Sequence, residues 1–156
     1  MQRFFVATSL LVGLFFHSYS ATAADLIETA STSGSLKTFI AAVKTAGLTE
    51  KLKEAGPYTI FAPIDSAFQN LPPGELDSLL KDKAKLAEVL KYHIIPGELT
   101  VAEVKPGEVK TIEGKTLTLT SDNGMVTVNG ADVIQSDVEA DNGIIHEIDA
   151  VVMPAK

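Results

Sequence analysis

The spacing of the apolar residues changes in the middle of the chain, and this change limits the fold more than any other feature of the sequence. In the first half, Leu36, Phe39, Ile40 and Val43 recur at helical intervals, which place their side chains on one face. Residues 116–120 instead alternate Thr-Leu-Thr-Leu-Thr, as in a half-buried strand. Helices in the first half and strands in the second predict an α+β domain with a mainly antiparallel sheet.

Caps and breakers set the limits of the expected helices and of the first strand. Ser35 is an expected helix N-cap and Gly47 an expected helix end, while Asp65 is placed to cap a short helix that runs through Phe68. Pro63 closes the strand before it because proline has no amide hydrogen to donate. The predicted elements are helices over 36–46, 65–68, 75–80 and 83–92 and a buried strand over 58–62.

Asn-Gly pairs divide the second half into hairpins, since Asn and Gly both accept positive φ. One pair is Asn123-Gly124 and the other is Asn129-Gly130. The last apolar stretch, residues 143–152, has few polar positions, which is typical of a strand covered on both faces. The predicted strands of this half are 109–112, 116–120, 125–128, 131–135 and 143–152.

The N-terminal residues have the features of an export signal. Arg3 gives a positive start, residues 4–16 form an apolar run, and residues 21–24 read Ala-Thr-Ala-Ala, the small-residue pattern that a signal peptidase cuts. The run is shorter than the ~20 residues that span a bilayer. We therefore expect residues 1–24 to be a cleaved signal peptide, residues 25–156 to form a single domain, and the product to be periplasmic or secreted. Retention of the segment as a membrane anchor is the alternative.

The composition of the exported chain excludes some classes of binding partner and of membrane attachment. Loss of Arg3 leaves 12 basic residues against 20 acidic ones, a net charge of −8, which disfavours nucleic acid because that binding needs Lys and Arg at phosphates. The chain has no cysteine, hence no disulfide, no thiol nucleophile and no lipid-bearing cysteine to anchor it. We expect a soluble monomer without a membrane anchor.

Three segments resemble those of a known family. Residues 59–68 (TIFAPIDSAF) and 142–154 (NGIIHEIDAVVMP) resemble the two signature segments of fasciclin (FAS1) domains, and residues 92–97 (YHIIPG) resemble the family's tyrosine-histidine segment. They occur in the family's order, and the similarity runs from about residue 25 to residue 154. The chain is therefore identified as similar to FAS1 domains.

The resemblance implies a fold, a role and a set of site residues. The implied fold is a wedge of two mainly antiparallel β-sheets with several helices packed around it, and the implied role is adhesion or another extracellular interaction. In animal members the tyrosine-histidine segment and an Asp-Ile dipeptide are implicated in receptor binding. By position, the resemblance implies partner binding by Tyr92, His93, Asp137 and Val138 and a structural role for Asp65, Phe68, His146 and Asp149.

The residues themselves favour structural roles for the histidines. His93 follows Leu90 at helical spacing, and His146 alternates with Ile144 and Ile148, so both imidazoles are expected on buried faces with hydrogen-bond partners. Asp149 is expected to lock an apolar strand through hydrogen bonds to its carboxylate. A metal site, an EF-hand loop starting at Asp137 and a catalytic triad all lack a matching pattern, so we expect no cofactor, no metal and no enzyme activity.

Two functions remain open. The first is an exported interaction module that binds an extracellular or cell-surface protein or glycan and helps cells attach, with Tyr92 as an aromatic anchor if it is partly exposed and Asp137 on the rim. The second is a soluble periplasmic protein that binds a small ligand such as an organic acid or an aromatic compound.

Overall fold

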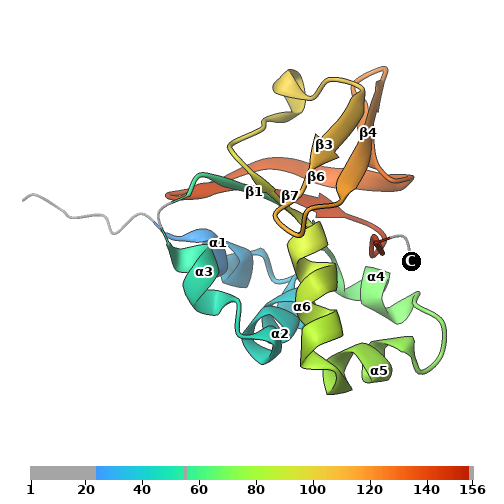
Figure 1. Cartoon of the computed structure of the whole chain (residues 1–156). Helices are drawn as coiled ribbons and strands as arrows, with labels where there is room; N and C mark the ends of the chain where they lie inside the picture. Colours follow the sequence, from blue (N-terminus) through green and yellow to red (C-terminus); the bar gives the residue numbers. More distant parts are fainter. Residues whose placement is uncertain (1–23, 55, 155–156) are drawn as a thin grey trace, which may run out of the picture.

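The computed structural model describes residues 24–54 and 56–154 and separates them into a helical part and a strand part (Figure 1). The helices are α1 (Leu26–Ser33), α2 (Lys37–Ala46), α3 (Thr49–Lys53), α4 (Asp65–Gln69), α5 (Glu75–Lys81) and α6 (Lys83–Tyr92). The strands are β1 (Tyr58–Pro63), β2 (Ile94–Pro96), β3 (Gly107–Lys110), β4 (Thr116–Asp122), β5 (Met125–Val128), β6 (Ala131–Ala140) and β7 (Gly143–Ile148). The α+β class predicted from the change of spacing is confirmed.

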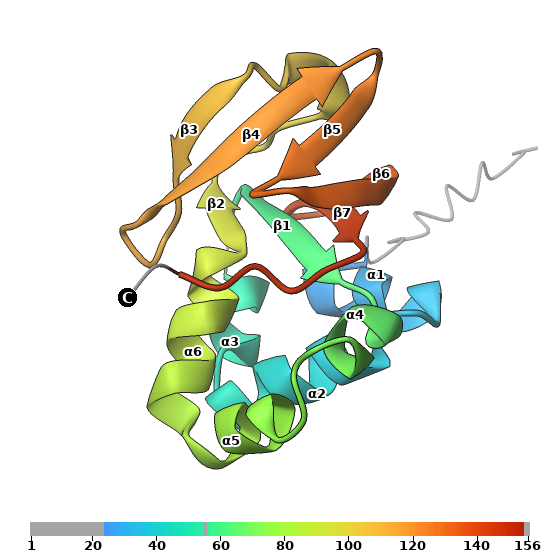
Figure 2. The same cartoon turned by 90° about the vertical axis from the view of Figure 1, so that its right-hand side faces the viewer.

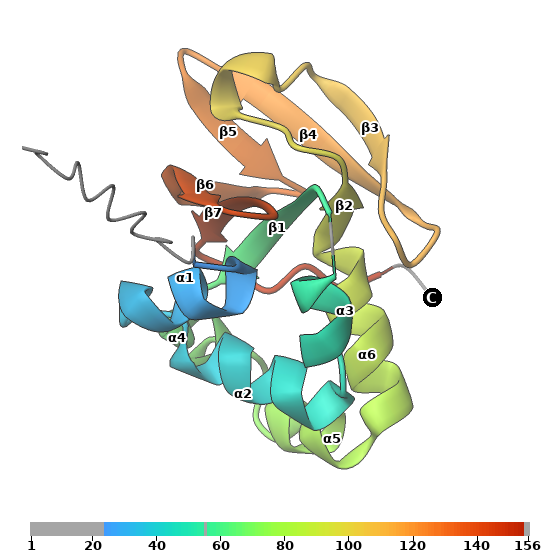
Figure 3. The ribbon, with the colours of Figure 1, turned by 90° about the vertical axis from the view of Figure 1, so that its left-hand side faces the viewer.

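Local sequence signals explain how the first helices begin and end. Helix α1 starts at a capping box, in which the Asp25 carboxylate accepts from the Glu28 amide at 2.9 Å and the Glu28 carboxylate accepts from the Asp25 amide. It ends at Gly34, and α2 ends at Gly47, both left-handed with φ of 75° and 74°. These short helices then fold against one another and against the sheet (Figure 3).

The strands follow one another in the order β2-β1-β7-β6-β5-β4-β3. Strand β6 joins the two parts of this order: Ala131 and Asp132 pair with β5, and the residues from Val133 onward pair with β7. All pairings are antiparallel except that of β1 with β7, which is parallel. The strands are mainly antiparallel, as predicted, and they form one continuous seven-stranded sheet in which β6 is shared between two halves (Figure 2).

Two apolar clusters fill the spaces on either side of β1 and β7. In β1, Ile60 and Ala62 face the cluster formed with the helices, whereas Phe61 belongs to the cluster enclosed by the strands. In β7, Ile145 belongs to the first cluster and Ile148 to the second. Every residue of β7 is buried, as expected for a strand covered on both faces.

Several local predictions are wrong in detail. Helix α2 begins at Lys37, and Ser35 does not cap it, because the Ser35 hydroxyl donates to the Glu147 carboxylate at 3.0 Å. Strand β7 ends at Ile148 and not at residue 152, since the chain bends at residues 149–150 and then passes across α6 (Figure 2). Strand β6 extends to Ala140, beyond the predicted end at residue 135.

The predicted signal peptide, residues 1–24, lies outside the described residues except for Ala24. Among the residues that are described, no helix combines the length and the apolar character needed to cross a bilayer.

Candidate partner-binding site

Tyr92, at the end of α6, is buried and fully hydrogen-bonded. Its side chain is 4% exposed, and its hydroxyl donates to the Thr116 carbonyl at 2.7 Å and accepts from the Asn129 side-chain amide at 2.8 Å. The phenol thus connects the helix to the start of β4 and to the turn after β5. The expectation of an aromatic anchor depended on a partly exposed Tyr92, and that condition is not met.

His93 is buried and connects α6 to the segment that follows β7 through hydrogen bonds. The ring is 1% exposed, its Nδ1–H donates to the Val89 carbonyl at 2.7 Å, and its Nε2 accepts from the Val152 amide at 3.0 Å. Burial lowers the pKa of His93 from 6.5 to about 4, against a smaller opposing effect of the bond to Val89. His93 is therefore a neutral imidazole whose two nitrogens are both engaged within the protein.

His146 has an equivalent position in β7. It is fully buried, it stacks on Phe61 with ring centroids 5.4 Å apart, and its Nε2–H donates to the Leu99 carbonyl at 2.7 Å. Its Nδ1 accepts from the Asp137 amide at 3.1 Å. Burial lowers the pKa of His146, and the bond to Leu99 and the nearby Asp137 carboxylate oppose that shift. The expectation that both histidines are packed and hydrogen-bonded is confirmed.

Asp137 and Val138 lie at an irregularity in β6, where the register to β7 shifts between Gln135 and Val138. Asp137 has a φ of 56°, unusual for a residue other than glycine, and such distortion is a feature of β-bulges. Its carboxylate accepts from the Val101 amide at 2.9 Å, yet its side chain is 45% exposed. Val138 is half-buried and packs on the helical cluster.

The bulge makes one stretch of β6 unusually accessible. Residues 134–137, which we call the bulge segment, are all exposed, although a regular strand covered on one face exposes every second residue. The segment contains Ile134, a large apolar residue that is 53% exposed. The sequence does not reveal this surface, because alternation alone does not show where a strand slips out of register.

The structure brings some of the expected site residues together and separates others. Asp137 and His146 are in contact through the bond from the Asp137 amide to the imidazole. Tyr92 and His93 instead bond to Thr116, Asn129, Val89 and Val152, and none of their hydrogen bonds within the described chain reaches Asp137 or Val138. The four residues implied for partner binding do not form one exposed cluster.

The signature residues make structural contacts, and some of these contacts differ from the expectation. Asp65 does not cap its own helix α4; its carboxylate accepts from the Thr38 amide at 2.7 Å and so caps the first turn of α2. Phe68 is 4% exposed and lies in the helical cluster. Asp149 is exposed beyond the end of β7, where its carboxylate accepts from the Asp132 amide at 2.9 Å. It locks two strands together without being buried.

The buried carboxylate of this region is Glu147, which sequence analysis did not single out. Its side chain is 3% exposed and accepts hydrogen bonds from the hydroxyls of Ser33 and Ser35, which lie around the end of α1. The available signal was a charged residue in the middle of an otherwise apolar strand, because such a residue must find donors.

The described residues contain no group of three or more His, Cys, Asp and Glu side chains arranged to hold a metal ion. The imidazoles are also committed to backbone partners at both nitrogens. The exposed surface among these residues is the bulge segment of β6, whose backbone is held by hydrogen bonds.

The arrangement of helices and strands matches a domain fold that is already known. A solved structure of a FAS1 domain pair from the insect cell adhesion molecule fasciclin I matches 84% of this chain and 51% of that chain, with a TM-score of 0.68. Its sequence identity is 19%, so this likeness concerns the fold alone.

The family model for the Fasciclin domain matches residues 34–154, and the chain belongs to this family. Protein sll1483 of Synechocystis sp. is 45% identical over 135 residues, which cover 85% of this chain and 75% of the relative. The transforming growth factor-beta-induced protein ig-h3 of Sus scrofa is 42% identical over 118 residues, 74% of this chain and 17% of the relative. The family resemblance drawn from the three sequence segments is confirmed.

Proposed function

We propose that this protein is an exported interaction module that binds an extracellular or cell-surface protein or glycan through the bulge segment and thereby helps cells attach to a surface or matrix. Membership of the Fasciclin family supports the proposal, since one solved structure with this fold comes from a cell adhesion molecule. The bulge segment is the single structural observation that carries it.

The backbone of the bulge is held in place on both sides of Asp137. The Asp137 amide bonds to the His146 ring, and the Asp137 carboxylate bonds to the Val101 amide. A surface that is already ordered loses little conformational entropy when a partner binds. The exposed part of the carboxylate offers an acceptor, and Ile134 offers apolar area nearby in the same strand.

In this proposal the tyrosine-histidine segment acts indirectly. Tyr92 and His93 position the strands and the segment after β7, and they do not touch the partner because they are buried. The 12 basic and 20 acidic residues after the signal segment further favour a partner that presents hydrogen-bond donors or positive charge.

The experiment is an attachment assay in the native host. A deletion strain is complemented with the wild type, with Asp137→Asn, or with Ile134→Thr; Asn keeps the size of the side chain and tolerates the positive φ of 56°. Met125→Thr is the matched control, because Met125 is 62% exposed in β5 outside the bulge segment. We expect wild type and Met125→Thr to restore attachment and both bulge variants to fail at equal protein levels. Restoration by all four proteins would contradict the proposal.

A further inference from the structure

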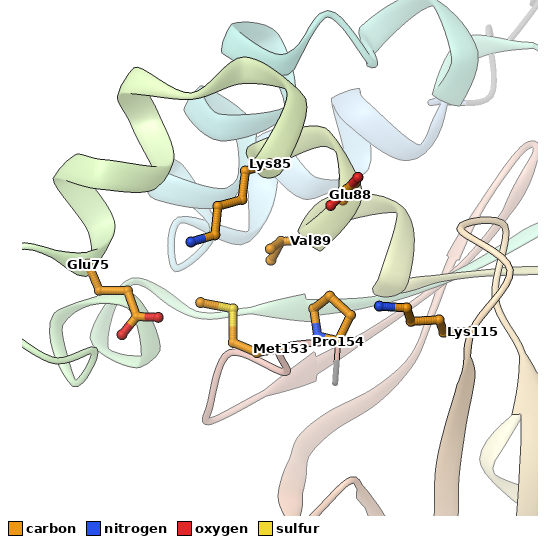
Figure 4. A pocket seen from close by; sticks show the side chains of 7 residues that line it. All are labelled: Glu75, Lys85, Glu88, Val89, Lys115, Met153 and Pro154. Atoms are coloured by element: carbon orange, nitrogen blue, oxygen red, sulfur yellow. The ribbon is translucent and has the colours of Figure 1, made fainter. Parts of the chain in front are cut away.

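A pocket of about 190 Å³ lies where α6, the start of α5 and the segment after β7 meet (Figure 4). The lining residues are Glu75, Lys85, Glu88, Val89, Lys115, Met153 and Pro154. None of them belongs to the bulge segment or to the tyrosine-histidine segment. The pocket is therefore a separate feature of the molecule.

The floor of the pocket is apolar and has room for one compact apolar group. Val89, Met153 and Pro154 form it, and Figure 4 shows them between the charged side chains. Apolar cavities of about 150 Å³ accept benzene, whereas drug-sized ligands need roughly 300 Å³ or more. The volume of this pocket suits a single ring or a branched aliphatic group.

Two oppositely charged side chains, Lys85 and Glu75, lie at one end of the pocket floor. Figure 4 shows Lys85 and Glu75 at the same end, with Lys115 and Glu88 toward the other. Within the described chain, neither the Lys85 ammonium nor the Glu75 carboxylate makes a hydrogen bond or an ion pair. Lys115 already has an interaction partner, so Lys85 and Glu75 are the charges available to a ligand at their end of the pocket.

This combination matches the chemistry of one class of ligand. A free α-amino acid carries its carboxylate and its ammonium on the same carbon atom, so the groups that bind them must lie at the same end of a pocket. Its side chain then extends in one direction, over whatever surface lies beside that end. A ligand with a single charge would leave either Lys85 or Glu75 without a counterion.

We propose that this pocket binds a free α-amino acid with an apolar side chain. The Lys85 ammonium binds the α-carboxylate, the Glu75 carboxylate binds the α-ammonium, and Val89, Met153 and Pro154 contact the side chain. This inference goes beyond the proposed attachment function and uses none of its residues, so that each proposal stands or fails alone.

The test is a titration of ¹⁵N-labelled protein followed by amide chemical shifts. The probes are L-phenylalanine, glycine, phenethylamine, which lacks the carboxylate, and 3-phenylpropanoate, which lacks the ammonium. We expect saturable shifts of α6 and of residues 152–154 with L-phenylalanine, and binding about tenfold weaker for each single-charge analogue, since a charged hydrogen bond contributes on the order of 1.5 kcal/mol. Glycine is expected to bind more weakly than all three because it has no side chain for the floor.

Two variants and one control show which side chain binds which charge of the ligand. Lys85→Met should weaken L-phenylalanine about tenfold and leave phenethylamine unchanged, while Glu75→Gln should weaken L-phenylalanine and leave 3-phenylpropanoate unchanged. Lys83→Met is the matched control, because Lys83 is exposed on the same helix and does not line the pocket. The absence of saturable shifts with L-phenylalanine would overturn the proposal. So would equal losses for the amino acid and both analogues in either variant.

Discussion

The Nε2 atom of His93 accepts a hydrogen bond from the Val152 amide 3.0 Å away, and this contact ties the last turn of α6 to the segment that follows β7. The other ring nitrogen donates to the Val89 carbonyl. A protonated ring would carry a hydrogen on both nitrogens and would lose the bond to Val152. The contact therefore requires a neutral imidazole in the folded state.

The free energy of unfolding should fall as the pH is lowered from about 6.5 to about 4. The unfolded chain protonates His93 near 6.5, whereas the folded protein holds the pKa of His93 at about 4. In this window the unfolded state binds more protons, so acid favours unfolding. The stabilisation lost through His93 is roughly 3 kcal/mol, and His146, whose pKa is also lowered, acts in the same direction.

Urea unfolding at several pH values measures this dependence. The control is His93→Gln, which removes the titrating group and should show a smaller fall in the free energy of unfolding over the same pH range. An unfolding free energy that stays constant between about pH 6.5 and 5 in the wild type would refute the buried neutral imidazole.

Replacement of Asp65 by alanine should destabilise the protein by about 1 kcal/mol, because the Thr38 amide at the start of α2 loses its acceptor. Asp122→Ala is the matched control: Asp122 is an exposed carboxylate at the end of β4, and its loss should change the free energy of unfolding by less than about 0.5 kcal/mol. Denaturant unfolding compares the two. Equal effects would show that Asp65 does not act as a cap.

Glu147, Ser33 and Ser35 should behave as one unit. The pair Ser33→Ala and Ser35→Ala leaves a buried carboxylate without these donors and should cost about 2–3 kcal/mol. Glu147→Val replaces the charge with a side chain suited to a buried strand and should change stability by less than about 1 kcal/mol. In the triple variant, which combines Glu147→Val with both serine replacements, stability should be only slightly lower than in Glu147→Val alone, because no buried carboxylate then needs the hydroxyls. If the serine replacements cost the same free energy of unfolding with Glu147 as with valine in its place, the three residues do not act as one unit.

Tyr92→Phe should lower stability by about 1–3 kcal/mol, since the Thr116 carbonyl and the Asn129 amide both lose the hydroxyl. Tyr58→Phe is the comparison, because Tyr58 is half-buried and its hydroxyl makes no hydrogen bond within the described chain. The midpoint of thermal unfolding distinguishes them. If Tyr92→Phe has the midpoint of the wild type, its hydroxyl is not part of the internal network.

Features controlled by neighbouring residues were predictable from the sequence. The Asn123-Gly124 hairpin is present, with φ of 49° and 81°, because only residues that accept positive φ close such a tight turn. Helical spacing from Leu90 likewise placed His93 correctly among the buried residues at the end of α6. In these cases, the outcome depends on backbone geometry within a few residues.

Features that depend on distant segments were not predictable. Asp65 and Ser35 each have good capping chemistry, but tertiary contacts direct Asp65 to α2 and Ser35 to Glu147. The exposure of residues 134–137 depends on the register between β6 and β7, which no local pattern reports. The same limit applies to Tyr92, whose burial results from contacts with Thr116 and Asn129.

Recognition at the β6 bulge, with the tyrosine-histidine segment in a supporting role, is tested most directly by comparing Asp137→Asn with Tyr92→Phe in the attachment assay, at a temperature where both proteins are folded. We predict that Asp137→Asn loses attachment while its stability stays near that of the wild type, and that Tyr92→Phe is less stable yet restores attachment. Loss of attachment in Tyr92→Phe together with full attachment in Asp137→Asn would contradict recognition at the bulge.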